Sequence, residues 1–468
     1  TGVQTCALPI CMACFTDDAE VIVKLVLADG HVISRAHSPA AFAAHDAAIK
    51  EILLKPFPDR VHLARPVARL ADYSGYVMRL MRDMTSFSDL AATSAEDIAR
   101  FPVDGGHRRR FLLLAKLAVQ LAKLHGAGLV YCDLSPNNVF VTKDPSAETQ
   151  NVWLIDADNV FVPGEDAPRL VYTPRYAAPE LLTLQPCSQA SDCYSLAVLA
   201  FESLAALHPF MGNKAEGLDS GDDWDASSTG KGGNSSAASV PDAFPEYSGK
   251  LPWVEDGEDD SNPTTNGLPR QFFLTDETFR LFNATFSEEG RTVPQTRPTA
   301  ALWARAFARS YAQSVRCPAC GMSFVHDGAS DCCPWCGAPF PPVLTLVSQG
   351  QIVFAHEAPF TKDSAGGWVP LPEFLFTPFS LDTAFRTPLA VRTVERAGYG
   401  LELAVQPESD SGLSFVITTE SGEDAIASRY TLCMQPGATY TLRSVSAGGG
   451  CTRVFQLELA LLSCTEEA

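Results

Sequence analysis

Residues 131–140, YCDLSPNNVF, set Asp133 and Asn138 around a proline, between apolar runs on both sides. An amphipathic helical pattern at about 108–125 precedes this stretch. A further aspartate, Asp156, stands at the end of the next strand-like run. Two oxygen ligands from separate segments suit Mg²⁺, which keeps waters and substrate phosphates in its other positions. A third polar group can accept a hydroxyl proton, so this set favours phosphoryl transfer.

The order of further motifs along the chain resembles that of the protein kinase family. YCDLSPNN resembles the kinase catalytic loop, and LIDAD (154–158) resembles the Asp-Phe-Gly segment. Four more segments resemble the third-strand lysine motif, the Ala-Pro-Glu motif, the start of the large buried helix and the terminal arginine motif: VIVK (21–24), YAAPE (176–180), SDCYSLA (191–197) and RPTA (297–300). Aminoglycoside and choline phosphotransferases share the aspartate-asparagine loop and the metal aspartate but lack the last three motifs.

The resemblance implies a role for each matching residue. Asp133 would be the catalytic base, and Asn138 and Asp156 would hold Mg²⁺. Lys24 would bind the α- and β-phosphates of ATP. Outside the site, the resemblance implies that Asp192 braces the catalytic loop, and that Glu180 of the Ala-Pro-Glu motif pairs with Arg297 of the terminal motif.

Two more residues belong to the expected nucleotide site. The usual partner of the lysine is a glutamate, and Asp46 takes its place because it shares the apolar stripe of the helix expected after Ser38-Pro39. Glu51 would point about 140° away at 100° per residue. Met81 ends the strand-like run SGYVMRLM (74–81) and is expected to contact the nucleotide.

Several positions depart from the kinase pattern. Tyr131 and Cys132 replace the usual histidine and arginine, so a phosphate on the activation segment loses its usual partner. Ser135 replaces a lysine that usually touches the γ-phosphate. Ala157 and Asp158 replace the Phe-Gly pair; Asp158 either caps a turn, the interpretation we favour, or adds a metal ligand.

Two functions follow from this pattern. The first is a serine/threonine protein kinase that transfers the γ-phosphate of Mg-ATP to hydroxyls of a protein substrate. The second is a weak or inactive pseudokinase scaffold that binds nucleotide and partner proteins. The presence of the lysine, the base and both metal-binding positions favours the enzyme, since loss of a catalytic base alone costs about 10²–10⁴ in rate.

Two cysteine pairs form the pattern C-x₂-C-x₁₂-C-x₂-C: Cys317, Cys320, Cys333 and Cys336. Four thiolates at this spacing suit a structural, tetrahedral Zn²⁺ with no open position for catalysis. Free thiols or disulfides are the alternative. Cys332 adjoins the second pair, but its spacing to the last cysteine is one residue too long for the knuckle. The sequence thus predicts a zinc ribbon, an interaction or spacer module with little basic charge for DNA.

Composition limits the partners. The net charge of −20 disfavours nucleic acid and anionic membranes, and the only basic cluster, Arg108–Arg110, is read as a solvated helix start. No apolar run reaches the roughly 18 residues of a membrane span. The cysteines outside the two pairs lack framework spacing, which favours a reducing cytoplasm.

The expected fold is an α+β bilobal kinase-like fold with a truncated N-lobe, then a zinc ribbon and an all-β domain. The N-lobe is expected at 11–84, and the C-lobe at 85–312 with a flexible acidic insert at about 212–265. The ribbon is expected at 313–342 and a β-sandwich or barrel at 343–468. Helical patterns are expected at 108–125, 191–206, 276–286 and 299–312.

The first ten residues, TGVQTCALPI, resemble the translation of a common sequencing adapter. A genuine apolar strand is the alternative. CMACF (11–15) resembles the strand that follows the glycine-rich phosphate loop of kinases. That loop is therefore expected where the adapter-like residues stand, and its absence is attributed to them.

Overall fold

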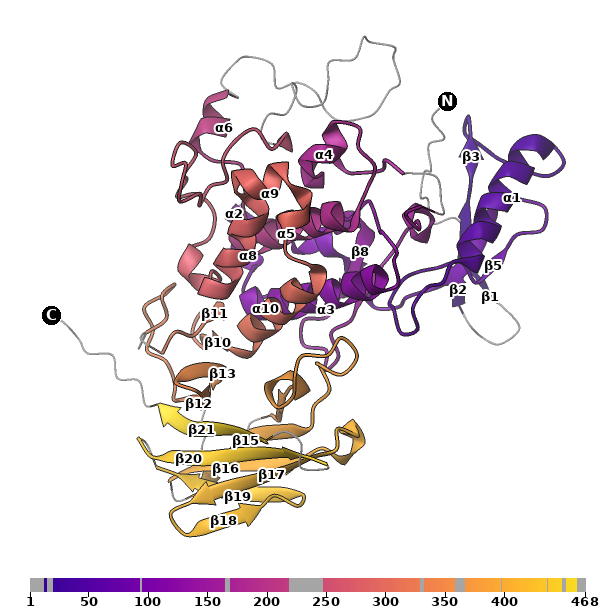
Figure 1. Ribbon diagram of the computed structural model, residues 1–468. Coiled ribbons are helices and arrows are strands. Elements are labelled where there is room, and N and C mark those ends of the chain that lie inside the picture. Colours follow the sequence, from indigo (N-terminus) through magenta and orange to yellow (C-terminus); the bar gives the residue numbers. More distant parts are fainter. Residues whose placement is uncertain are drawn as a thin grey trace. The chain divides into compact units, whose positions relative to one another are not determined.

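The structure of the protein is a computed structural model (Figure 1). It describes residues 12–14, 20–92, 95–164, 169–218, 247–328, 332–357, 367–396, 398–435, 437–447 and 452–460. The adapter-like residues 1–10 lie outside this set. The described residues form two compact units. The first draws on 1–91, 116–267 and 280–300, and the second on 92–115, 268–279 and 301–468.

A four-stranded sheet of order β1-β2-β6-β5 carries the lysine motif in the first unit. Its strands are Met12–Cys14 (β1), Glu20–Leu25 (β2), Gly75–Arg79 (β6) and Ala68–Arg69 (β5). β1 and β2 pair antiparallel, and β2 pairs with β6 so that Lys24 lies opposite Tyr76. Two short strands that follow β2 in the chain, Leu27–Ala28 (β3) and His31–Val32 (β4), pair with each other in a separate sheet.

The helices predicted from the apolar periodicity are present, together with several short helices that were not predicted. The bounds are Pro39–Leu54 (α1), Ala95–Arg100 (α2), Gly106–Gly126 (α3), Pro179–Leu182 (α4), Gln189–Ala205 (α5), Asn213–Leu218 (α6), Asp276–Phe286 (α8), Glu288–Thr292 (α9) and Ala300–Ala312 (α10). Helix α5 begins with a capping box between Ser188 and Ser191, and its residues from Ser191 to Ala205 are buried. This burial explains why its sequence is almost continuously apolar.

A small three-stranded sheet supports the catalytic loop in the same unit. Its order is β7-β8-β9, with strands Met84–Ser86 (β7), Val139–Thr142 (β8) and Val152–Leu154 (β9). β8 and β9 pair antiparallel with Val139 opposite Leu154. The segment that follows Asn138 and the segment that leads to Asp156 therefore meet at one end of this sheet.

The acidic insert is only partly the loose loop that composition predicts. Trp253 is 0% exposed, and its ring centroid lies 5.9 Å from that of Phe201 and 5.8 Å from that of Phe286. Asn262 is also buried and donates hydrogen bonds to the carbonyls of Phe210 and Pro252. One large aromatic side chain can anchor a polar segment, and a composition average over the whole insert hides it. Residues 219–246 lie outside the described residues.

The second unit contains the strand-rich part of the chain, as the sequence predicts (Figure 1, orange to yellow). A two-stranded sheet joins Ser314–Arg316 (β10) to Ser323–Val325 (β11). A six-stranded sheet has the order β13-β12-β21-β20-β17-β18: Gln351–Glu357, Val343–Ser348, Thr452–Ala460, Thr439–Ser446, Leu413–Thr419 and Gly422–Ala425. A four-stranded sheet has the order β14-β15-β16-β19: Val369–Leu371, Leu389–Arg396, Gly398–Val405 and Arg429–Met434.

The arginines at the start of α3 correct another expectation. Arg110 is only 1% exposed, and its guanidinium lies 3.6 Å from the ring centroid of Phe101. Arg109 is buried too and donates to the carbonyl of Asp104 at 3.0 Å. Burial lowers the pKa of Arg110, and only a stacked or paired guanidinium tolerates such a position. This cluster is a packed helix start, not a solvated one.

Candidate active site

The catalytic-loop stretch is held from behind by one buried aspartate. Asp192, near the start of α5, accepts hydrogen bonds from the backbone N–H groups of Tyr131 at 2.8 Å and Cys132 at 2.9 Å. The Nε2 of His125 lies 3.0 Å from the same carboxylate. Cys132 takes a left-handed backbone conformation with φ of 77°, which turns the chain toward Asp133. The bracing role that the resemblance implies for Asp192 is confirmed.

The expected base and one expected metal ligand contact each other. The side-chain N–H₂ of Asn138 donates to the backbone carbonyl of Asp133 at 2.8 Å and to its carboxylate at 3.1 Å. The other carboxylate oxygen of Asp133 accepts a hydrogen bond from the Thr173 hydroxyl at 2.7 Å. Thr173 has no counterpart in the sequence prediction. The Asp133 carboxylate thus already accepts one hydroxyl hydrogen bond, the kind of contact that a general base makes with its substrate.

Lys24 forms an ion pair with Asp156, the second residue expected to bind Mg²⁺. Lys24 Nζ lies 2.8 Å from Asp156 and 3.1 Å from Asp158, and the Tyr76 hydroxyl donates to Asp158 at 3.3 Å. Burial works against the charge of Lys24, but Asp158, Tyr76 and Asp156 outweigh it and raise the pKa of Lys24 above its ordinary value. Lys24 is therefore a fixed cation at neutral pH.

Asp158 and Tyr76 belong to this cluster but were missed as lysine partners. Asp158 lies in the 3-10 helix Ala157–Asn159 (η3), but its carboxylate contacts Lys24 and Tyr76, so its side chain does not form the turn cap favoured from the sequence. Asp156 precedes this turn with φ of 57°. The signal for Tyr76 is its register: it stands directly opposite Lys24 across β2 and β6.

Asp46 does not fill its expected place. Among the described residues its carboxylate pairs with Arg69 at 2.6 Å and with Lys50 at 2.9 Å, rather than with Lys24. The predicted burial of Asp46 on α1 is correct. The partner differs because Arg69, on the neighbouring strand β5, and Lys50, one turn along the helix, both reach this short carboxylate, while Lys24 is engaged by two other aspartates.

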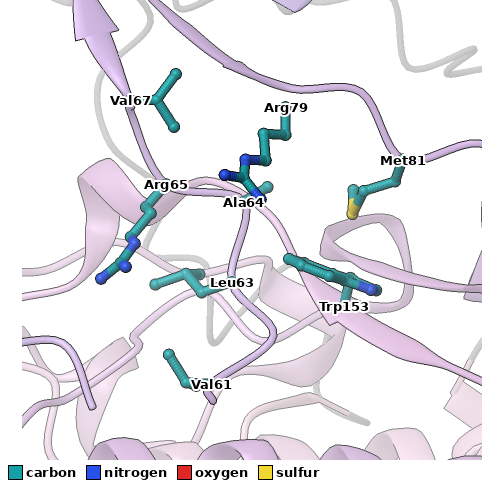
Figure 2. Close-up of a pocket in the computed structure, with 8 residues that line it drawn as sticks. All are labelled: Val61, Leu63, Ala64, Arg65, Val67, Arg79, Met81 and Trp153. Atoms are coloured by element: carbon teal, nitrogen blue, oxygen red, sulfur yellow. The ribbon is translucent and has the colours of Figure 1, made fainter. Parts of the chain in front are cut away.

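Met81 faces a different hollow of the first unit. Met81 lines a cavity of about 220 Å³ together with Trp153 of β9 and two exposed arginines, Arg65 and Arg79. Figure 2 shows these side chains. The remaining lining residues of the cavity are apolar: Val61, Leu63, Ala64 and Val67. None of the other predicted site residues lines this cavity. The structure therefore brings Lys24 and Asp156 into one cluster and Asp133 and Asn138 into contact, and places the Met81 side chain elsewhere.

The oxygen ligands that the catalytic loop offers fit a magnesium ion. The N–H of Ile155 donates to the carbonyl of Asn138 at 3.0 Å, which sets Asp156 one residue from that contact. The side-chain N–H₂ of Asn138 donates to Asp133. The side-chain oxygen of Asn138, Oδ1, is therefore the atom left to bind a cation. A carboxylate and an amide oxygen from two segments are hard ligands of the kind Mg²⁺ prefers.

The second structural pair implied by the resemblance is also confirmed. Arg297 binds Glu180 through two parallel hydrogen bonds of 2.7 and 2.8 Å. Its Nε donates to the carbonyl of Gly290 at 2.7 Å. Both side chains are almost fully buried, so the bidentate geometry and the extra carbonyl are what offset the cost of removing two charges from water.

The four predicted zinc ligands converge in the second unit. All four sulfur atoms lie within 4.8 Å of one another, with 3.8 Å between Cys317 and Cys336 and 3.7 Å between Cys320 and Cys333. A tetrahedron with Zn–S bonds of about 2.3 Å has edges of about 3.8 Å. The cluster thus fits Zn²⁺, and Cys332 stands outside it, disulfide-bonded in the structure.

Each knuckle is built by the same backbone device. In the first knuckle, the N–H of Cys317 donates to the carbonyl of Met322, and the N–H of Gly321 donates to the carbonyl of Cys317. In the second, the N–H of Gly337 donates in the same way to the carbonyl of Cys333. Gly321 and Gly337 have φ of 77° and 72°, a conformation that favours glycine. The repeated C-P-x-C-G, not used in the prediction, is the sequence signal for this turn.

Comparison with known proteins places the similarity in the same region. Residues 105–229 match the model of the protein kinase domain family, a segment that includes the catalytic loop and the Ala-Pro-Glu motif.

Among the described helices, none combines the length and apolar character that a membrane crossing requires.

The curated relatives are serine/threonine-protein kinases of modest similarity. The chain is 32% identical over 94 residues to serine/threonine-protein kinase 17A of Oryctolagus cuniculus, which is 20% of this chain and 24% of that protein. It is 33% identical over 98 residues to PknA of Mycobacterium tuberculosis, or 21% of this chain and 22% of that protein. It is 34% identical over 111 residues to pkn2 of Myxococcus xanthus, or 22% of this chain and 13% of that protein. The matched segments span less than a third of the length of these relatives.

Proposed function

We propose that this chain is a serine/threonine protein kinase that transfers the γ-phosphate of Mg-ATP to hydroxyl groups of a protein substrate. The observation that carries the proposal is the contact set of Asp133. Its carboxylate already accepts one hydroxyl hydrogen bond, from Thr173 at 2.7 Å, and is fixed by Asn138 at 3.1 Å. The kinase relatives and the family match over 105–229 support it.

Each residue then has a chemical task. Asp133 accepts the proton of the substrate hydroxyl, and the Asp192 brace keeps its loop in place. Asn138 and Asp156 would hold Mg²⁺, which supplies positive charge against the phosphate oxygens. Lys24, permanently protonated, pairs with the phosphates by exchanging its contacts with Asp156 and Asp158.

One observation favours the alternative of a pseudokinase scaffold. Lys24 is bound by two carboxylates, and each competes with a triphosphate for the same ammonium group. A protein of this kind would bind nucleotide and partner proteins with little or no transfer. Asp46 does not relieve the competition, because it pairs with Arg69 and Lys50.

The test compares Asp133→Asn with the parent chain in the presence of labelled ATP, Mg²⁺ and a basic protein acceptor. The enzyme interpretation predicts a loss of transfer of about 10²–10⁴ with nucleotide binding retained. Asp59→Asn, at an exposed position of the same unit, is the matched control and should behave as the parent. ATP binding with no labelling by either protein would favour the scaffold, and equal labelling by both would show that Asp133 is not the base.

The remaining assignments rest on the same proposal. We infer an N-lobe at 11–84 and a C-lobe at 85–312. The Cys₄ cluster would hold a structural Zn²⁺ in a ribbon at 313–342, followed by a β-sandwich-like domain at 343–468. A cytoplasmic location, with protein partners and neither nucleic acid nor membrane, is consistent with the net charge of −20.

A further inference from the structure

The residue before helix α3 cannot cap that helix with a side chain. It is Gly105, and the helix itself begins at Gly106. The first N–H groups of a helix have no partner within the helix, and a serine, threonine, aspartate or asparagine at its start usually supplies one. Here the acceptor comes from a distant part of the chain, because the N–H of Arg108 donates to the hydroxyl oxygen of Ser323 at 2.9 Å.

Ser323 holds the helix start by a second hydrogen bond. The Nδ1 of His107 lies 2.8 Å from the Ser323 carbonyl, and since a carbonyl oxygen only accepts, Nδ1 carries the proton. Both residues are 0% exposed. Gly106 has φ of 59°, and a Cβ at this position would collide with the Ser323 hydroxyl, so glycine permits the close approach.

The Cys₄ segment determines where Ser323 lies. Ser323 follows Met322, whose carbonyl accepts the N–H of Cys317 and so closes the first knuckle. It also pairs with Arg316, the residue before Cys317, across β10 and β11. The serine that caps α3 is therefore built into the same turn that positions one pair of sulfur atoms.

Both knuckles also pack against one buried ring, that of Phe272. Its centroid lies 5.9 Å from the ring of Phe324, which follows Ser323, and 6.0 Å from that of Trp335 in the second knuckle. It lies 6.0 Å from His107 as well. All of these residues belong to the second unit. The start of α3 and the Cys₄ segment thus share one apolar contact in addition to the two hydrogen bonds.

We propose that the Cys₄ segment is the cap of α3, and that zinc bound by its four cysteines orders the start of this helix. The ion fixes both knuckles, the first knuckle fixes Ser323, and Ser323 keeps the N–H of Arg108 paired. From the sequence, this segment was expected to be a separate interaction or spacer module. Its contacts point instead to a metal-dependent support of a helix in the kinase-like part of the chain.

The other end of α3 connects the cap to the catalytic loop. The helix continues to Gly126, and His125 in its last turn lies 3.0 Å from Asp192. Asp192 in turn accepts the N–H groups of Tyr131 and Cys132 in the loop. Zinc occupancy would therefore affect how firmly the catalytic loop is held. This last step rests on the function proposed above, whereas the cap itself does not.

Hydrogen exchange of the full chain with and without zinc tests the cap. Zinc is removed with EDTA and restored with zinc sulfate, and elemental analysis follows the metal content. Removal should speed exchange in residues 107–112 by about fivefold, the effect of losing one helix cap, and zinc should restore the protection. Helix α5 has a capping box of its own and should keep its protection in both states.

A variant tests the same contact without touching a metal ligand. Ser323→Ala removes the acceptor but none of the four cysteines, so it should retain zinc and still lose protection in residues 107–112. Ser314→Ala is the matched control, because Ser314 is equally buried in the same two-stranded sheet and donates its hydroxyl to the carbonyl of Ser310. It should keep both the zinc and the protection.

The outcomes separate the cap from the zinc site. Unchanged exchange in residues 107–112, either in the zinc-free chain or in Ser323→Ala, would overturn the cap while leaving the zinc site intact. A parent chain that takes up no zinc from zinc sulfate would overturn both. Loss of protection in α5 together with α3 would mean that the chain unfolds as a whole, and would also overturn a local cap.

Discussion

At the scale of single residues, the site is decided by competition among carboxylates for Lys24. The lysine is bound by Asp156 and Asp158, and Asp46 is bound by Arg69 and Lys50. These two groups are separate within the described residues. The charge of Lys24 is secure, because the nearby acids raise its pKa against the effect of burial. What the arrangement controls is therefore not protonation but how freely the ammonium group can meet a phosphate.

The first prediction tests the role of Asp158. Replacing it with asparagine removes one competitor of the phosphates and one negative charge near them. An ion pair of this exposure contributes about 0.2–1 kcal/mol, so Asp158→Asn should bind Mg-ATP up to about fivefold more tightly in calorimetry. If Asp158 instead binds a metal ion, the same variant would bind Mg-ATP more weakly. Asp59→Asn is the exposed control and should leave the affinity unchanged.

The contacts that could be predicted from the sequence are those that are local or that follow from the spacing of motifs. Asp133 and Asn138 lie five positions apart and do touch, and the Glu180–Arg297 pair followed from two motifs that require each other. It failed where several partners compete in space. Nothing in the sequence near Asp46 says that Arg69 reaches it first.

At the scale of elements, the same limit applies to burial. Helix bounds were predictable because α10 has a regular apolar period and α5 is mostly apolar over its whole length. The packing of Arg110 on Phe101 and of Trp253 on Phe201 was not, because each depends on one side chain in an otherwise polar window. Composition and charge counts, which average over a segment, do not detect a single buried side chain of this kind.

The second prediction concerns the link between α4 and the terminal arginine motif. Arg297→Ala leaves Glu180 as an unpaired buried charge and should lower the stability of the first unit by about 3–5 kcal/mol. The urea midpoint, followed by tryptophan fluorescence, measures the loss. The double variant Glu180→Leu/Arg297→Met removes both charges and should recover much of it. A double variant as unstable as Arg297→Ala would mean that lost packing, not the orphaned charge, causes the effect.

The third prediction concerns pH and the segment after α5. His208 is buried, with its Nε2–H directed to the carbonyl of Arg175 at 3.0 Å, and burial, aided by the charge of Arg175, lowers its pKa from 6.5 to about 4. Below pH 6.5 the unfolded chain binds a proton that the folded chain refuses. Stability is therefore complete above pH 6.5 and falls as pH drops toward 4, by up to about 3 kcal/mol from this residue.

Thermal unfolding at pH 7.5 and pH 5 measures this slope. His208→Gln keeps a donor for the Arg175 carbonyl but cannot be protonated, so its stability should change less between the two pH values than that of the parent. His31→Gln, at an exposed position, should keep the slope of the parent. An unchanged slope in His208→Gln would assign the acid sensitivity to other groups.

At the scale of the whole molecule, both units bury apolar side chains, and one segment of the second unit also brings four cysteines together. The first buries a nearly continuous apolar helix, α5, among aromatic side chains. The Cys₄ segment of the second has two short strands, β10 and β11, and its two knuckles depend on positive-φ glycines rather than on a wide core. We expect a bound metal to stabilise this segment, since structural Zn²⁺ contributes about 10–16 kcal/mol in small peptides at neutral pH.

The last prediction is that the chain binds one zinc ion with four sulfur ligands. The edges of 3.7 and 3.8 Å match a tetrahedral site, so elemental analysis of the purified protein should give one zinc per chain. Cys320→Ser should lose the metal, and hydrogen exchange around both knuckles should rise sharply. Cys433→Ser, which removes an exposed free thiol outside the cluster, should keep both the metal and the protection. Zinc retained in Cys320→Ser, or protected knuckles in a metal-free parent chain, would show that this segment folds without the ion.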